Sequence, residues 1–291
     1  MKKKSEFLLI ILCNGRPNNV KTYDTLMKAG YDEDWIILCD DQDKTVPGYK
    51  DRFGDRVVVF DKEKTAEGVD LADNFEGLNI ANIARNACYD VAEALGYEYF
   101  LVFDDDYTQF EYRFNDKLEY ITANKKMKNL YPVWCSYLNW LKCDERIYSV
   151  CFAQGGDFIG GGQGFFGTKI RTKRKGMNSF FSSTKRRMKY RCRMNDDINS
   201  SIMHNIVGDI VITVGNTALL QPPTQKVAGG MTDVYVNSGT YIKSFYTVMI
   251  SPSSAKITLM GNKHKRLHHN VTWNKTAPLI VAEKYRKKSS K

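Results

Sequence analysis

The sequence predicts an α/β protein with a mainly parallel, doubly wound sheet that is flanked by helices. Short, continuous apolar runs lie at 6–13, 35–39, 56–60 and 99–103, and such runs are typical of strands that are buried on both faces. Helical segments alternate with these runs, as they do in doubly wound folds. Aspartates follow three of the runs, at the strand ends where such sheets bind their ligands.

The elements of the first half follow in order from local signals. Pro17 lies in the turn after the first run and opens a helix that we expect to end near Gly30. Residues 62–78 are polar and contain glycine, so we expect a loop there. Residues 79–95 form the clearest predicted helix, because their apolar residues recur at i, i+3, i+4 and i+7.

The second half has a different composition. Residues 118–141 are rich in aromatics and predict a helix with a break near Pro132. A second helix is expected to begin at Asn195-Asp196-Asp197 and to reach Ile206. A turn is expected at 221–223. The expected strands are 148–152, 209–214, 216–220 and 245–250.

Composition excludes several classes of protein. A hydrophobic content of 43% in 291 residues is typical of a globular protein, not a disordered one. The seven cysteines include no CxxC pair, which favours reduced thiols in a cytoplasmic protein over disulfides or a zinc site. We expect no membrane span and no signal peptide, because the apolar runs are too short for either.

The net charge of +10 is concentrated in one segment. Residues 169–193 carry eleven lysines and arginines and no acid, so the remainder of the chain is close to −1. This segment indicates a contact with a polyanion, and the alternative is a solvated surface run. Phe180, Phe181 and Tyr190 lie among the cations, a combination that suits nucleic acid.

The run at 99–103 ends in three consecutive carboxylates, Asp104, Asp105 and Asp106. In extended geometry Asp104 and Asp106 point the same way, while Asp105 points the opposite way. Mg²⁺ and Mn²⁺ prefer carboxylate oxygens and bridge readily to phosphates. The triplet therefore predicts an Asp-x-Asp metal clamp, and the alternative is a solvated acidic turn.

These pieces, in this order, resemble the nucleotide-sugar domain of GT-A glycosyltransferases. The features that carry the resemblance are the opening strand with its turn, Asp40-Asp41, the helix with Ala84-Arg85-Asn86, and Asp104-Asp105-Asp106. The resemblance implies a Rossmann-like GT-A fold and a hexosyltransferase that uses a UDP-sugar. Residues 1–115 would form the nucleotide-sugar-binding half, and 116–291 the acceptor-side and C-terminal half of the same domain.

The resemblance also implies how the donor nucleoside is held. Asp40 or Asp41 would accept a hydrogen bond from the uracil N3–H or from the ribose hydroxyls, and turn formation is the alternative role for this pair. Cys13, Asn14 and Arg16 would line the base.

Polar residues on the predicted 79–95 helix suggest a second donor contact. Asn79, Asn82 and Asn86 share one face of the helix, and asparagine is a poor residue for a helix interior. We therefore expect a ligand-facing row that includes Asn82. Arg85 would pair with the donor pyrophosphate or with the clamp, and a surface arginine is the alternative. Asp105 is also assigned to the donor side.

In the resembling families, Mn²⁺ or Mg²⁺ bridges the clamp and the donor diphosphate. Asp104 and Asp106 would hold this ion here. A late histidine often adds a further ligand, and His264 and His268 are the candidates, with His269 beside them. The alternative for these histidines is an exposed basic loop.

An inverting transferase needs a general base for the acceptor hydroxyl. Asp196 and Asp197 match in position the acidic pair that opens the acceptor-side helix in many GT-A enzymes. Helix capping is the alternative role for these residues. The glycine-rich stretch at 155–164 lacks a P-loop pattern, so we expect it near the sugar or the acceptor, with Asp157 bonding sugar hydroxyls.

A GT-A domain with a basic segment in a cytoplasmic chain resembles the phage-type, TET-associated enzymes that glycosylate hydroxymethylated pyrimidines in DNA. This resemblance implies DNA as the acceptor, in the host cytoplasm if a phage encodes the chain. Phe180 or Phe181 would stack in the gap that an extruded base leaves. A polysaccharide, lipid or protein acceptor is the rival hypothesis, and a non-catalytic nucleic-acid-binding protein is a further one. The residues expected to grip the DNA backbone are Lys185, Arg186, Arg187, Lys189, Arg191 and Arg193.

Overall fold

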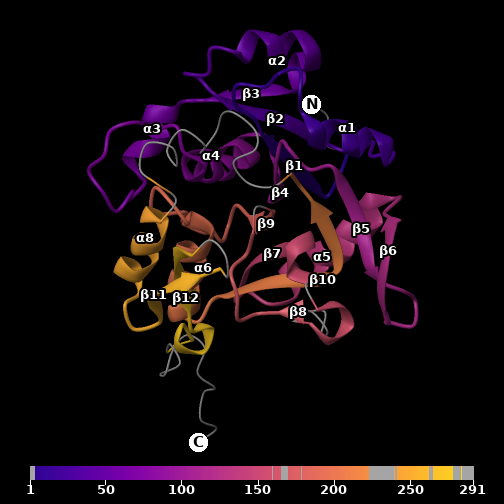
Figure 1. The fold of residues 1–291 in the computed structure, drawn as a ribbon. Helices are drawn as coiled ribbons and strands as arrows, with labels where there is room; N and C mark the ends of the chain where they lie inside the picture. The colour runs from indigo at the N-terminus through magenta and orange to yellow at the C-terminus, as the bar shows by residue number, and fades with distance from the viewer. Residues whose placement is uncertain are drawn as a thin grey trace, which may run out of the picture.

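The structure, a computed structural model, describes residues 4–158, 160–164, 170–177, 179–222, 239, 241–261, 265–277 and 283. Its central feature is one large sheet with the strand order β3-β2-β1-β4-β9-β7-β10-β5-β6, and β8 pairs with β10 (Figure 1). The N-terminal part of this sheet is parallel. Its strands are β1 (Phe7–Leu12), β2 (Trp35–Asp40), β3 (Val57–Phe60) and β4 (Tyr99–Asp104).

Strand β9 (Phe180–Ser183) joins the parallel part to the rest of the sheet. It runs antiparallel to β4 on one side and to β7 (Ile147–Gln154) on the other. Beyond β7 the sheet is mixed, because β10 is parallel to β7 while β5 and β8 are antiparallel to β10. The remaining strands of this sheet are β5 (Gln109–Phe114), β6 (Tyr120–Lys126), β8 (Ile170–Arg171) and β10 (Ile210–Leu220).

Helices cover both faces of the parallel part, which explains the continuous apolar sequence of β1. Phe7, Leu9 and Ile11 pack with residues of α1, α2 and α5 on one face, while Leu8 and Ile10 pack with α4 on the other. The helices around the sheet are α1 (Lys21–Lys28), α2 (Val46–Phe53), α3 (Lys62–Glu67), α4 (Ala81–Ala94), α5 (Leu130–Cys143) and α6 (Asp196–Ile206).

A smaller layer lies beside α6, at the lower left of Figure 1. It consists of α8 (Ile242–Ile250) and an antiparallel hairpin of β11 (Ala255–Met260) and β12 (Arg266–Val271). In the described part of the chain, no helix is both long enough and apolar enough to cross a membrane. The short 3₁₀ helices are η1 (Gly54–Arg56), η2 (Gly155–Phe158), η3 (Gly161–Gln163) and η5 (Trp273–Lys275).

Most of the strands of the first half, and the helices at 79–95 and 195–206, lie where the sequence predicts them. The strands expected at 209–214 and 216–220 form the single strand β10, whose register shifts between Val214 and Ala218. The first helix begins at Lys21 and not at Pro17. The turn expected at 221–223 lies partly outside the described residues.

Three element predictions are wrong. The expected loop at 62–78 begins with α3, whose N-cap Asp61 accepts a hydrogen bond from the Lys64 amide. The expected helix at 118–141 is strand β6 followed by α5, and Pro132 lies in the first turn of α5, where it breaks no hydrogen bond. The expected strand at 245–250 belongs to helix α8.

Candidate active site

The acidic triplet lies at the carboxyl end of β4, in the middle of the parallel part of the sheet. Asp105 is buried and forms an ion pair of 2.6 Å with Arg16 of the β1–α1 loop. Asp104 is the last residue of β4, and 28% of its side chain is exposed. Asp106 keeps its buried Oδ1 without a hydrogen-bond partner. Asp105 Oδ2 is likewise buried without a hydrogen-bond partner, so both Asp105 and Asp106 keep one unpaired carboxylate oxygen.

Arg85 of α4 connects this triplet to a second acidic pair. Its guanidinium lies 3.7 Å from Asp104 and donates a hydrogen bond to Asp196 at the start of α6. Only 6% of the Arg85 side chain is exposed, and it lies over the rings of Phe180 and Tyr190. The alternative of a surface arginine is thus wrong, and Arg85 bridges the two groups of acids.

Burial perturbs the carboxylates of the triplet. It raises the pKa of Asp104 to about 6, although Arg85 opposes the shift, and it raises the pKa of Asp105 to about 7 against Arg16. Burial also raises the pKa of Asp106. Desolvated acids so close together are stabilised in their charged form by a divalent cation. Among the described residues, no group of three or more His, Cys, Asp and Glu side chains is arranged to hold a metal ion.

The pKa values of the two carboxyls at the start of α6 are shifted in opposite directions. Burial raises the pKa of Asp196, and Arg85 opposes this. Burial acts on Asp197 too, but Lys175 and Arg85 outweigh it and lower the pKa of Asp197. Lys175 Nζ lies 3.2 Å from Asp197 Oδ2. Asp197 is therefore a carboxylate at neutral pH.

Asn195 does not cap α6 with its side chain, so the capping role expected for this stretch is wrong at that residue. Its Nδ2 instead donates to the Lys243 carbonyl (2.8 Å) and lies 3.1 Å from His269 Nδ1. These contacts connect the start of α6 to α8 and β12.

The histidines have different neighbours from those expected. His268 and His269 lie on β12 with their ring centroids 4.2 Å apart. Burial lowers the pKa of His268, and Arg266 and Lys243 lower it further. His268 therefore lies among cations, and it forms no metal-binding group with the clamp acids in the described part of the chain. His264 lies outside the described residues.

Among the expected donor-binding residues around β1 and β2, Asp40 and Cys13 are buried, whereas Asp41 is exposed. Asp40 is buried, with Lys62 Nζ at 2.7 Å and the Asn14 amide donating to it at 3.0 Å. Cys13 is buried in the core, where burial raises the pKa of its thiol. Both side chains are thus occupied within the protein. Asp41 is exposed and accepts a hydrogen bond from the Lys62 amide (3.0 Å).

Lys62 is a residue that the sequence reasoning missed, because its position was assigned to a loop. A lysine directly after an Asp at a strand end was the available signal.

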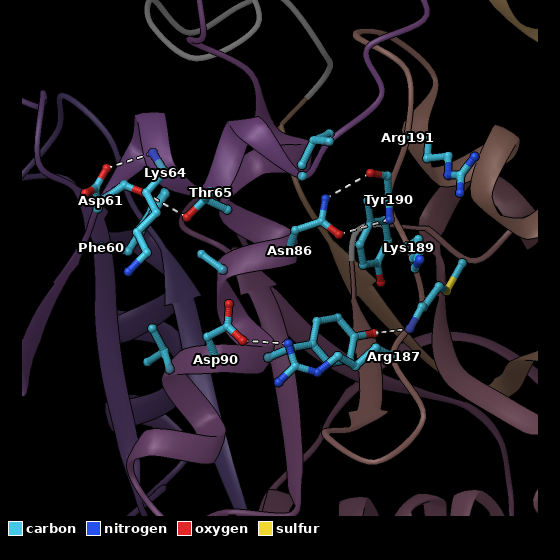
Figure 2. Close-up of a pocket in the computed structure, with 16 residues that line it drawn as sticks. Phe60, Asp61, Lys64, Thr65, Asn86, Asp90, Arg187, Lys189, Tyr190 and Arg191 are labelled. Atoms are coloured by element: carbon cyan, nitrogen blue, oxygen red, sulfur yellow. Dashed lines mark hydrogen bonds and ion pairs between the residues drawn. The ribbon is translucent and has the colours of Figure 1, made fainter.

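Asn82 and Asn86 of the expected row make contacts within the protein, while Asn79 is exposed and lies before α4. Asn82 is buried and donates to the Cys192 carbonyl (2.9 Å), and Asn86 exchanges hydrogen bonds with the backbone of Tyr190 (Figure 2). The expectation that Asn82 binds the donor is therefore wrong. Asn82 and Asn86 instead hold the segment 186–193 against α4. A pocket of about 500 Å³ lies on this side of α4, between α3 and residues 187–191.

Most of the expected DNA-contacting side chains of the basic segment make contacts within the protein. Lys185 pairs with Glu98 at 2.8 Å, and Arg187 pairs with Asp90 and Glu93 of α4. Arg186 donates to the carbonyls of Leu141 and Asp144 after α5, at 2.7 and 2.8 Å. The Lys185 and Arg187 side chains are 71% and 40% exposed, so DNA would compete only with their surface ion pairs, whereas Arg186 is held by two backbone carbonyls.

Arg193 is buried as well, so it cannot reach a DNA backbone. It pairs with Asp73 and donates to the carbonyls of Phe75 and Gly77, which holds the 70–77 loop in place. Phe180 and Phe181 are fully buried in β9 and cannot stack on a base. Of the expected DNA contacts, Lys189 is exposed and Arg191 is half-buried.

The glycine-rich stretch at 155–164 is held by an ion pair. Asp157 accepts from the Gln154 amide (2.9 Å) and pairs with Arg174 at 2.8 Å. Asp157 therefore orders its own turn, which leaves it less suited to bind sugar hydroxyls than expected.

Comparison with solved structures gives distant likenesses. A mycobacterial protein matches with a TM-score of 0.46 and 8% identity, covering 91% of this chain and 83% of its own. Glucosyl-3-phosphoglycerate synthase from Mycobacterium tuberculosis, crystallised with Mn²⁺, UDP-glucose and phosphoglyceric acid, matches with a TM-score of 0.43 and 11% identity, covering 90% and 85%. GalNAc-T7, crystallised with UDP, GalNAc and Mn²⁺, matches with a TM-score of 0.42 and 10% identity, covering 74% and 43%. No curated protein matches the sequence.

Comparison with protein families gives a match to TET-associated glycosyltransferases over residues 7–230. This span includes the acidic triplet, Arg85 and the Asp196-Asp197 pair, and it ends before α8. The predicted α/β fold, with a large sheet that is parallel in its N-terminal part and flanked by helices, and the predicted glycosyltransferase class are confirmed. The chain belongs to the TET-associated glycosyltransferase family.

Proposed function

We propose that the protein transfers a hexose from a UDP-sugar to the hydroxyl group of a modified DNA base, such as 5-hydroxymethylcytosine, in the cytoplasm. The observation that carries this proposal is the buried bridge from Asp104 through Arg85 to Asp196. It connects acids at the end of a parallel strand, where such sheets bind nucleotides, to acids that open a helix on the other side of the site. A transferase must hold its donor and its acceptor in a fixed position relative to each other.

Asp104 and Asp106 are the residues that would hold Mn²⁺ or Mg²⁺. The unpartnered oxygen of Asp106 and the raised pKa values of both carboxyls fit a divalent cation. Two carboxylates are sufficient, because these ions complete their coordination with water and substrate phosphates. When bound, the ion would neutralise the negative charge that develops on the departing diphosphate. The ion pair of Asp105 with Arg16 would hold the backbone between the two clamp residues in position.

Asp41 is the residue that remains for the donor nucleoside, because the Asn14 amide donates to Asp40. Asp41 is exposed at the end of β2, while Asp40 is neutralised by Lys62. A carboxylate with an exposed edge can accept from uracil N3–H or from ribose hydroxyls. We therefore assign nucleoside recognition to Asp41, and a supporting role to Asp40.

Asp197 is the base of the proposed inverting reaction. The acceptor oxygen forms a bond to the anomeric carbon while the bond to the diphosphate breaks, and the hydroxyl proton passes to Asp197. Lys175 and Arg85 lower the pKa of Asp197, so it is ionised and has lone pairs that can accept this proton. Asp196, held by Arg85, keeps the start of α6 in position relative to the donor clamp. A target base must be extruded from duplex DNA, or come from a single strand, to bring its hydroxyl to Asp197.

The test is a direct search for product. The protein is incubated with a panel of nucleotide sugars, Mn²⁺ and hydroxymethylated DNA, and the digested nucleosides are weighed by mass spectrometry. We expect one sugar to add a hexose mass to the modified nucleoside, with loss of product in Asp106→Ala or with excess chelator. Asp116→Ala, at an exposed acid between β5 and β6, is the matched control and should keep full activity. Transfer in excess chelator would refute the metal-dependent mechanism, and transfer only to a polysaccharide, lipid or protein would refute the acceptor.

A further inference from the structure

A pocket on the outer side of α4 takes no part in the site described above (Figure 2). It has a volume of about 500 Å³ and lies between α3 and the chain at 187–191. None of the described residues that line it belongs to the acidic triplet or to the Asp196-Asp197 pair. Its volume is within the range of ligand-binding clefts, about 300–1,000 Å³. We call it the α4 pocket.

Three cations line the α4 pocket from its two walls. Lys64 lies on the α3 wall, and Lys189 and Arg191 lie on the opposite wall (Figure 2). Lys64 and Lys189 are exposed, and Arg191 is half-buried. Within the part of the chain that the structure describes, none of these three side chains forms an ion pair. Their charges are therefore available to a ligand, unlike that of Arg187 in the same pocket, which pairs with Asp90.

The wall formed by 187–191 is held in place by α4. Met188 and Tyr190 are buried and pack in the same apolar cluster as residues of α4. Asn86 also bonds to both backbone groups of Tyr190. Lys189 and Arg191 alternate with these buried residues along the chain. The positions of both cations are thus set by packing and not by a flexible loop.

The other charged and amide side chains of the α4 pocket have partners within the protein. Asn86 uses its amide nitrogen and its oxygen on backbone groups, Asp90 pairs with Arg187, and Asp61 accepts from the Lys64 amide. A small ligand such as a free nucleotide needs further donors and acceptors for its base and its sugar. Phosphates of a nucleic-acid strand need only cations, because contacts to the backbone read charge and not sequence.

The 187–191 wall also contacts the helix that carries the proposed base. The Lys189 amide donates to His204 Nε2 (3.4 Å), and the Arg191 amide donates to Ser200 Oγ (3.3 Å). Both acceptors lie on α6, the helix that opens with the Asp196-Asp197 pair. The α4 pocket is therefore connected to the acceptor side of the site.

Resting on the proposed function, we infer that the α4 pocket binds backbone phosphates of the acceptor DNA strand, away from the nucleotide that receives the sugar. Lys64 on one wall, with Lys189 and Arg191 on the other, would contact phosphate oxygens from both sides. These contacts hold the strand while the hydroxyl of the modified base lies at Asp197. They increase the affinity for a strand over a free nucleoside and leave the transfer step unchanged.

The test compares Lys64→Gln/Lys189→Gln, the pocket variant, with Lys28→Gln/Lys50→Gln as the matched control of equal net charge. Lys28 and Lys50 are exposed on α1 and α2, which cover the face of the sheet opposite to α4. Binding of a labelled, unmodified single-stranded oligonucleotide is measured by fluorescence anisotropy in a salt series. We expect the pocket variant to bind about threefold more weakly or worse, with the slope of log affinity against log salt reduced by about 1.4 for two lost phosphate contacts. The control should stay within about twofold of the wild type.

Transfer kinetics separate a strand contact from a role at the active site. The acceptors are an oligonucleotide with a central 5-hydroxymethylcytosine and the free nucleoside 5-hydroxymethyl-2′-deoxycytidine. We expect KM for the oligonucleotide to rise about threefold or more in the pocket variant, while kcat and transfer to the nucleoside stay within about twofold of the wild type. Equal losses on both acceptors would place these cations at the active site and overturn the inference.

Two other ligands are tested with the same variants. Binding of UDP in excess chelator, measured by calorimetry and lost in the pocket variant, would make the pocket a nucleotide site. Variant-sensitive flotation with phosphatidylserine-containing vesicles, at unchanged oligonucleotide binding, would make it a membrane contact. Either result would overturn the inference, and so would wild-type transfer to DNA with unchanged oligonucleotide binding in the pocket variant. Variant-sensitive oligonucleotide binding without any transfer by the wild type would instead refute the proposed function and support the strand contact.

Discussion

Substitution of Arg85 by methionine tests the bridge on which the site depends. Arg85 is the cation between Asp104 and Asp196, and its side chain is 6% exposed while that of Asp196 is 14% exposed. Methionine keeps much of the volume against Phe180 and Tyr190 but removes the charge. Breaking a buried ion pair by removal of one partner costs about 3–5 kcal/mol, because the other charge stays desolvated. We expect Arg85→Met to lower the free energy of unfolding by this amount at pH 7 and to abolish transfer.

A double-mutant cycle isolates the bridge from simple packing. Asp196→Asn removes the stranded charge, so the double variant Arg85→Met/Asp196→Asn should recover about 1–3 kcal/mol of the loss. The assay is urea unfolding followed by tryptophan fluorescence. Arg52→Met is the matched control, because Arg52 pairs with Asp24 at 2.9 Å on the surface and should contribute less than about 1 kcal/mol. Equal costs for Arg85→Met and Arg52→Met, with additive effects of Asp196→Asn, would refute the reasoning.

Asp106→Asn should abolish divalent-dependent binding of the nucleotide sugar in calorimetry without changing the melting temperature, and tight chelator-resistant binding would contradict the clamp. Burial lowers the pKa of His269 to about 4, against about 6.5 when unfolded, so its contribution to stability is complete above pH 6.5 and is lost as the pH falls toward 4. We expect the free energy of unfolding to fall by about 1–2 kcal/mol across that range after solvent screening, and we expect no such fall in His269→Gln. Urea titrations at several pH values measure this, and the same pH dependence in the variant as in the wild type would count against it. Phe181→Ala should cost about 3–5 kcal/mol of stability, because the ring is fully buried, and selective loss of DNA binding at full stability would restore its stacking role. Arg193→Lys should speed limited proteolysis within the 70–77 loop, because lysine cannot replace the three-way contact to Asp73, Phe75 and Gly77, and an unchanged cleavage pattern would show that other contacts hold the loop.

The parallel part of the fold was predictable because its signals are local. Residues 7–11 of β1 are buried on one of two faces, so the apolar run is continuous, and α4 buries one face, so its pattern is periodic. The segment at 245–250 is rich in β-branched and aromatic residues and favours a strand by composition. In α8, Phe245 and Met249 are exposed four residues apart while Ser244 and Thr247 are buried, a helical pattern that depends on packing against β11 and β12.

The site was predictable where its residues are adjacent in sequence. Asp104 and Asp106 end one strand, and Asp196 and Asp197 begin one helix, so local order was enough to single them out. The role of Arg85 was left open between the clamp, the pyrophosphate and the surface, because an arginine on a helix has no local mark of burial. The pairing of Asp40 with Lys62 required knowledge that β2 and the start of α3 lie together.

The basic segment shows why charge counted along a sequence is a weak guide to a binding surface. Its cations lie without acids for 25 residues, yet Asp90 and Glu93 of α4, Glu98 before β4 and Asp73 all reach it in the fold. The field at a surface depends on the sum over such neighbours, and most of them are about 90–120 residues away in sequence.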